Sequence, residues 1–205
     1  MGVFNRTIAV RYANMWALSR NRNFRDYSGR GSGGDCTNFV SQVMLAGGWP
    51  EVYGIPPQQW FYKGDGIEVL AGIPLNQPSR SWAGAQPFSE FIESSGRAKR
   101  CNREDLELAD IVQVYLKERG EVVHTVVVTD VIHAQHKRSD IDQFYVCYHS
   151  NDHRNKLLDQ FEANYSGDKA EFLYWKVQDM FPYIPPAGAF SYAYEQWLKT
   201  NQLLP

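Results

Sequence analysis

Three parts of this chain of 205 residues could together supply a nucleophile and its base. Cys36 offers a thiol, His124 an imidazole, and His149, Asn151 and Asp152 offer a third polar group. A thiol becomes a strong nucleophile when a histidine removes its proton and a further polar side chain fixes the orientation of that histidine. The three parts are far apart in the sequence, so the fold has to bring them together.

Cys36 is placed where a loop gives way to a helix. Two glycines permit a tight backbone approach and Asp35 is a good N-cap residue, which predicts a helix that begins at Cys36. The apolar face of this helix and the glycines that end it are Phe39, Val40, Val43, Met44, Gly47 and Gly48. A thiol in the first turn faces the positive end of the helix dipole, which predicts a lowered pKa. The alternative is that Cys36 is a small buried apolar residue.

His124 lies near the start of the strongest strand pattern in the chain, residues 122–132. It is either an edge histidine with a satisfied hydrogen bond or the base that ionises the thiol. Side chains alternate along a strand, so His149 and Asn151 are expected to share a face. The segment of His149, Ser150, Asn151 and Asp152 supplies a third polar group that can accept a hydrogen bond from His124, and the residues alone leave open which of them does so.

The elements that must position these residues show helical and extended patterns in turn. Besides the helix at Cys36, the predicted helices are residues 5–20, 88–96 and 193–199, and the predicted strands are residues 111–116, 122–132, 143–149 and 172–177. Residues 21–34 and 49–85 are rich in Gly, Pro and polar or aromatic residues, which is typical of irregular structure. The predicted fold class is α+β, with the nucleophile at the N-terminus of a helix packed on an antiparallel sheet.

Composition narrows the function classes. The length and the 43% hydrophobic content predict one domain, residues 1–205. A formal net charge of -2 and a pI near 6.2 argue against nucleic acid or an anionic membrane as the main partner. The 3 cysteines are an odd number at wide spacings, which fits neither a disulfide framework nor a zinc cluster. We therefore expect no metal and no cofactor.

The N-terminal residues lack the uninterrupted apolar core of a secretory signal, because Arg6, Arg11, Asn14 and Arg20 interrupt them. No stretch approaches the roughly 20 apolar residues of a membrane span. We expect a soluble chain that is cytoplasmic until a non-classical or contact-dependent route exports it, or else the mature form of an exported protein.

A set of blocks in the right order resembles the putative amidase domain family, which is allied to the CHAP and NlpC-type branch of the papain-like cysteine peptidases. The blocks are FNRTIAVRYANMWA, GGDCTNFVSQVMLAGG, WFY at 60–62, SW at 81–82, LADIVQVY, HTVVVT and YHSND. They cover most of residues 4–155, and GGDCTNFVSQ is the most specific of them. The resemblance implies a papain-like fold.

The resemblance also implies roles for individual residues. Cys36 would be the nucleophile, His124 the base that later protonates the leaving amine, and His149 the residue that orients His124, with Asn151 beside it. The oxyanion would be held by the backbone N–H of Cys36 and one further donor. The candidates for that donor or for the wall of the substrate cleft are Asp35, Tyr62, Trp60 and Trp82.

The implied activity is hydrolysis of an amide through a thioester acyl-enzyme on Cys36. The expected substrate is a peptide stem or cross-link of peptidoglycan, or another peptide, and a cell-wall enzyme of this kind would suit a secreted toxin held by an immunity or inhibitor protein, or a phage lysin. Two alternatives stay open, namely a thiol hydrolase or acyltransferase that acts outside the wall, and a catalytically inactive binding module.

Overall fold

The structure is a computed structural model that describes residues 1–29, 34–53, 56–62, 78–134, 142–165 and 169–181. These residues form an α+β fold in which helices pack on an antiparallel sheet, as the sequence predicts. The helix predicted over residues 193–199 lies outside the described residues. No helix among the described residues is long and apolar enough to cross a membrane.

The main sheet has 6 strands in the order β2-β7-β3-β4-β5-β6, and each neighbouring pair is antiparallel. The strands are β2 (Ala98–Arg100), β3 (Ile111–Leu116), β4 (Glu121–Ile132), β5 (Gln143–Tyr148), β6 (His153–Leu157) and β7 (Ala170–Val177). A second, 2-stranded sheet pairs β1 (Gly2–Val3) with β8 (Met180–Phe181). The predicted meander of β3, β4 and β5 is confirmed, and β7 joins it on the far side of β3.

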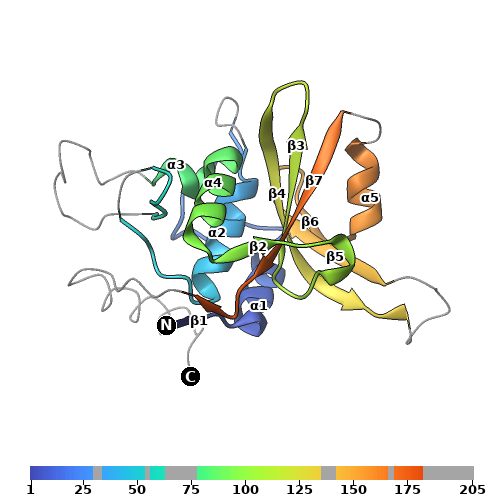
Figure 1. Ribbon diagram of the computed structural model, residues 1–205, viewed down its shortest axis with the longest axis horizontal. Coiled ribbons are helices and arrows are strands. Elements are labelled where there is room, and N and C mark those ends of the chain that lie inside the picture. Colours follow the sequence, from blue (N-terminus) through green and yellow to red (C-terminus); the bar gives the residue numbers. More distant parts are fainter. Residues whose placement is uncertain (30–33, 54–55, 63–77, 135–141, 166–168, 182–205) are drawn as a thin grey trace.

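The helices cover the two faces of the sheet unequally. On one face lie α1 (Arg6–Trp16), α2 (Cys36–Ala46), α3 (Arg80–Ala83) and α4 (Ala85–Ser95), and on the other lies α5 (Leu158–Glu162), as Figure 1 shows. Two short 3-10 turns are η1 (Arg103–Asp105) and η3 (Ala163–Tyr165). The larger helical layer contacts the sheet mainly through β4, which is therefore the strand that α2 faces.

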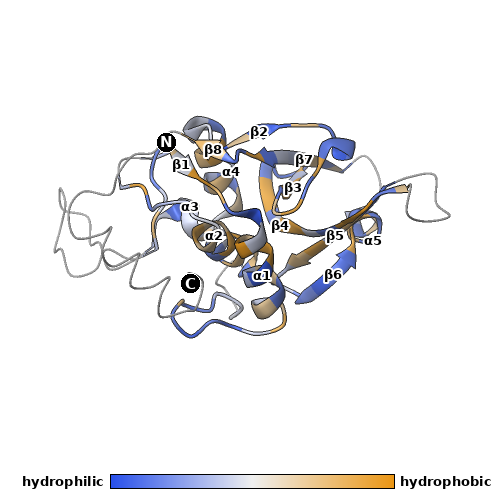
Figure 2. Cartoon of the chain, turned by 90° about the horizontal axis from the view of Figure 1, so that it is seen from below, coloured by the Kyte–Doolittle hydropathy of each residue, from blue (hydrophilic) through white to orange (hydrophobic). Residues whose placement is uncertain are grey.

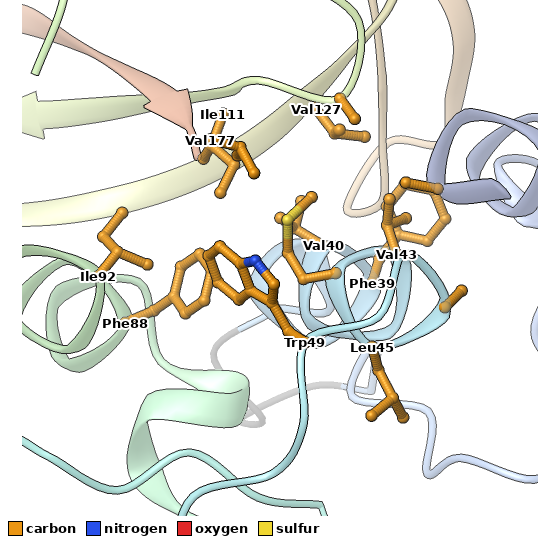
Figure 3. Close-up of a cluster of buried hydrophobic side chains, with 14 of the residues drawn as sticks. Phe39, Val40, Val43, Leu45, Trp49, Phe88, Ile92, Ile111, Val127 and Val177 are labelled. Atoms are coloured by element: carbon orange, nitrogen blue, oxygen red, sulfur yellow. The ribbon is translucent and has the colours of Figure 1, made fainter. Parts of the chain in front are cut away.

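The larger core lies between α2 and the sheet. Phe39, Val40 and Val43 of α2 meet Ile111 and Val127 of the sheet there (Figure 3), and all five side chains are fully buried. A smaller core lies on the opposite face, where alternate residues of β3 and β4 pack on α5. Every residue of α2 is buried, and β5 contributes side chains to the cores on both faces of the sheet. Both elements are therefore coloured mostly hydrophobic in Figure 2, whereas the edge strand β6 is hydrophilic.

Several elements differ from the sequence prediction. The first helix ends at Trp16, four residues earlier than predicted, and the fourth begins at Ala85 instead of residue 88. The short elements β2, β6 and α5 were not predicted, and α3 lies in a segment predicted to be irregular. The sequence of β6, HRNKL, has no apolar face, so it gives no strand pattern. This strand is held by backbone pairing at the sheet edge.

The sheet side of the larger core gives a first prediction. Ile111→Ala should lower the free energy of unfolding by about 2–5 kcal/mol, because a fully buried side chain leaves a cavity between the sheet and α2. Ile132→Ala, at the partly exposed end of β4, is the control and should cost less than about half as much. Urea unfolding measures both, and equal losses would contradict this placement of the core.

Candidate active site

The helix of Cys36 begins where the sequence predicts, with Cys36 as the first residue of α2. Asp35 occupies the N-cap position, as predicted, but its side chain makes no capping hydrogen bond. The carboxylate instead turns into the protein, where it is fully buried. The helix start is thus fixed by contacts to other elements rather than by its own cap.

Four donors surround the Asp35 carboxylate. Its Oδ1 accepts from the backbone N–H of Tyr27 at 3.0 Å and from Nδ2 of Asn38 at 2.7 Å. Its Oδ2 lies 2.6 Å from Nδ1 of His149 and 3.1 Å from Nε of Arg20. A buried carboxylate is tolerated only when it is paired and hydrogen-bonded in this way. The start of α2 is therefore held by the segment after α1 and by the residue that follows β5.

His149 has a different role from the one predicted. Its Nδ1 faces Asp35, its Nε2 donates to the carbonyl oxygen of Trp16 at 2.9 Å, and its ring stacks on Phe39 at 4.1 Å between centroids. Both ring nitrogens are thus engaged, and neither contacts His124. The expectation that His149 orients His124 is corrected, because His149 points toward the helical layer and supports Asp35.

His124 is separate from that network and packs against residues of the smaller core. Its ring packs edge-on against Tyr148 at 5.4 Å and stacks on Phe161 at 5.7 Å between centroids. Burial lowers the pKa of His124 to about 4, so the imidazole is neutral at pH 7. Among the described residues neither ring nitrogen has a hydrogen-bond partner, so aromatic packing alone sets the orientation of the ring.

A bulge positions His124. Val114 of β3 faces His124, but the next residue, Tyr115, faces Val122, so Val123 is an extra residue in β4. A bulge of this kind breaks the regular alternation and redirects the neighbouring side chains. Val123 and His124 both line one cavity as a result.

The thiol of Cys36 is anchored on the strand that carries His124. Its Sγ lies 3.8 Å from the Thr37 hydroxyl, and that hydroxyl lies 3.0 Å from the hydroxyl of Thr125 on β4. Burial outweighs these hydrogen bonds and raises the pKa of Cys36. The predicted lowering of that pKa is therefore wrong. At pH 7 Cys36 is therefore a neutral thiol and His124 a neutral imidazole.

Cys36 and His124 open onto the same cavity, of about 690 Å³. Asn151 belongs to its wall as well, together with aromatic side chains of β5, α5 and η3: Tyr148, Phe161 and Tyr165. The volume is that of a ligand site, and the wall combines one thiol, one imidazole and apolar rings. Chemically, this arrangement can hold an acyl group against the thiol.

Asn151 lies at the tip of the β5-β6 hairpin. Ser150 and Asn151 have positive φ angles of 65° and 74°, which suits a tight two-residue hairpin turn. The Ser150 hydroxyl accepts from the backbone N–H of Asp35 at 2.8 Å, so the turn is attached to the start of α2. Asp152 faces away from His124 and forms two hydrogen bonds with Arg20, at 2.8 and 2.9 Å.

The four further candidates lie outside the cavity wall. The indoles of Trp60 and Trp82 are fully buried in the larger core, where they donate to Ser41 and Asn38. The hydroxyl of Tyr62 accepts from a backbone N–H at 2.6 Å, and the backbone N–H of Asp35 is already bonded. Their prediction as oxyanion or cleft residues is corrected, because packing and existing hydrogen bonds use them.

Other residues of the wall were not found from the sequence. Lys156, Asn164 and Tyr165 reach the cavity from β6 and η3, neither of which has a periodic apolar pattern. Tyr148 had a usable signal, since it precedes His149 on a predicted strand and must face the opposite side. Among the described residues no three His, Cys, Asp or Glu side chains are grouped to hold a metal ion.

Comparison with known proteins identifies the family to which the chain belongs. A family model described as "Putative amidase domain" matches residues 3–175. Among curated proteins the chain is similar to "Uncharacterized protein YjcM" of Bacillus subtilis (strain 168), with 27% identity over 158 residues that cover 72% of this chain and 31% of that protein. The chain thus spans about a third of the length of the curated relative it matches. No solved structure matches it.

The buried carboxylate gives a second prediction. Asp35→Asn should lower the free energy of unfolding by about 3–5 kcal/mol, because it removes the charge that His149 and Arg20 face inside the protein. Asp26→Asn is a matched control, since Asp26 also contacts Arg20 but its side chain is 51% exposed, and it should cost less than about 1 kcal/mol. Chemical denaturation compares the two, and equal costs would refute a special role for Asp35.

The buried imidazole gives a third prediction, on pH. Because the pKa of His124 falls to about 4 in the folded state, the unfolded chain binds more protons between its ordinary value and pH 4. Stability should therefore decrease as the pH falls through that window, by about 3 kcal/mol at pH 4 from this group alone. His124→Leu should remove this part of the decrease. Denaturation curves at pH 7.5 and pH 4 test it, and an equal decrease in both proteins would contradict the burial effect.

Proposed function

Since the chain belongs to the putative amidase domain family, for which amidase-type hydrolysis is the expected activity, we propose that it hydrolyses an amide through Cys36. The observation that carries the proposal is that Cys36 and His124 line one cavity, while the hydroxyls of Thr37 and Thr125, the residues that follow them, lie 3.0 Å apart. The helix-borne thiol packed against an antiparallel sheet also supports a papain-like fold, which is part of the proposal.

In the proposed reaction His124 takes the proton of the Cys36 thiol as the sulfur attacks the amide carbon. The C–N bond then breaks, and His124 returns that proton to the leaving amine. Water, deprotonated by His124, attacks the resulting thioester and releases a carboxylic acid and the free thiol. Because the resting pair is neutral, proton transfer accompanies the attack instead of preceding it.

The supporting groups are proposed as follows. The backbone N–H of Cys36, at the start of α2, holds the oxyanion. Asn151 is the third polar group, since it shares the cavity wall with His124. His149 acts at a distance by holding Asp35 and the start of α2.

We take a peptide stem or cross-link of peptidoglycan as the proposed substrate class, on the family resemblance. An enzyme that cleaves cell walls requires an export route and, in a toxin, an immunity or inhibitor protein that covers the cavity. Both are parts of the proposal rather than features of the described residues.

One observation favours a rival function, a catalytically inactive binding module. Burial raises the pKa of Cys36, and no hydrogen bond among the described residues orients His124. An inactive module would keep its ligand after Cys36→Ala. A thiol hydrolase or acyltransferase on other substrates would instead lose activity but leave cell walls intact.

The fourth prediction tests the enzyme. Wild-type protein incubated with isolated cell walls should release new muropeptides, and Cys36→Ala should reduce that release by more than about 1000-fold because the nucleophile is lost. Cys101→Ala, which removes a thiol away from the cavity, is the control and should keep full activity. Liquid chromatography with mass spectrometry measures the products. If neither wild type nor Cys36→Ala releases muropeptides, and iodoacetamide does not alkylate Cys36, the proposal is refuted.

A further inference from the structure

The cavity that contains the thiol also contains a cationic side chain, Lys156 of β6. Lys156 pairs with Val146 in the sheet, and its Nζ lies 6.0 Å from the centre of the Tyr148 ring. Tyr148 in turn packs on His124. The ammonium group is therefore held beside the ring that positions the imidazole, on the wall that a bound substrate would touch.

No acidic residue balances this charge. The described residues of the cavity wall include neither Asp nor Glu. Arg20 is paired with Asp152 and Lys176 with Glu107, but no carboxylate among the described residues lies within ion-pair distance of Lys156. Asp152, in the turn before β6, is hydrogen-bonded to Arg20 and does not line the cavity.

A cation on a partly apolar wall gains most from an anionic ligand. The wall around it includes Tyr148, Phe161 and Tyr165, and such rings exclude water when a ligand enters. Lysine presents a compact charge on a flexible stem, which suits a single carboxylate rather than a planar two-point contact. A peptide is the proposed substrate, and the anionic group that a peptide offers is a carboxylate.

We propose that Lys156 is a specificity-determining residue that binds a free carboxylate near the scissile amide, so that the substrates are amides of acidic or carboxyl-terminal character. This inference rests on the proposed function, because it requires Cys36 to be the reacting group. It assigns the substrate class by the charge of the cavity, and it predicts that neutral amides of equal size are poor substrates.

The fifth prediction uses two alkylating reagents of similar size, iodoacetate and iodoacetamide, that differ by one negative charge. In wild-type protein Lys156 should favour the reaction of Cys36 with iodoacetate relative to iodoacetamide. Lys156→Met and Lys156→Gln should lower that rate ratio about tenfold while leaving the iodoacetamide rate nearly unchanged, and Lys156→Arg should keep the ratio. Lys99→Met, on an exposed position of β2, is the control and should also keep it.

Peptide mass spectrometry follows the two rates at Cys36, and the iodoacetamide rate reports whether each variant is folded. An unchanged ratio in both Lys156→Met and Lys156→Gln, with Cys36 still reactive, overturns the inference and leaves the proposed function intact. No reaction of Cys36 with either reagent overturns the proposed function and this inference with it. With a cleavable peptide in hand, kcat/KM for matched carboxylate and carboxamide forms should show the same loss of preference.

Discussion

The buried carboxylate of Asp35 is the interaction on which the rest of the site depends. It gathers four donors from three parts of the chain that are remote in sequence, namely the segment after α1, the first turn of α2 and the end of β5. A buried charge is costly unless every such partner is in place, so the carboxylate penalises any arrangement in which these segments separate. Its position next to Cys36 means that the same constraint fixes the place of that thiol.

The second determinant is the burial of Cys36 and His124 away from water. Burial raises the pKa of Cys36 and lowers that of His124, and both shifts favour the uncharged forms. A helix start favours a thiolate, but the polar groups that reach the sulfur are too few to offset the loss of water. Cys36 and His124 are thus both uncharged in the structure. The ammonium of Lys156 adds a positive charge to the wall of the cavity that they line.

A polar chain crosses the larger core and reaches this pair. Nε1 of Trp175 donates to Gln113 at 3.0 Å, Gln113 donates to the Thr125 hydroxyl at 3.2 Å, and that hydroxyl lies 3.0 Å from Thr37. Each member is satisfied by the next, so the chain fixes the register of α2 on β7, β3 and β4. Since Thr37 and Thr125 follow Cys36 and His124 directly, that register also sets where these two residues lie relative to each other.

The sequence predicts the parts of the site that rest on local patterns and misses those that rest on the sheet edge. The start of α2 and the strand of His124 follow from a glycine-aspartate loop and from β-branched density, and both are confirmed. The partner of His149 could not be predicted, since alternation gives the face of a side chain but not the element that covers it. The β5-β6 hairpin shows why this matters: its turn holds the start of α2 through Ser150, while its second strand supplies Lys156 to the cavity. One hairpin therefore both holds the start of α2 and contributes to the cavity wall, so substitutions at its turn should alter the position of Cys36, whereas those at Lys156 should alter only the choice of ligand.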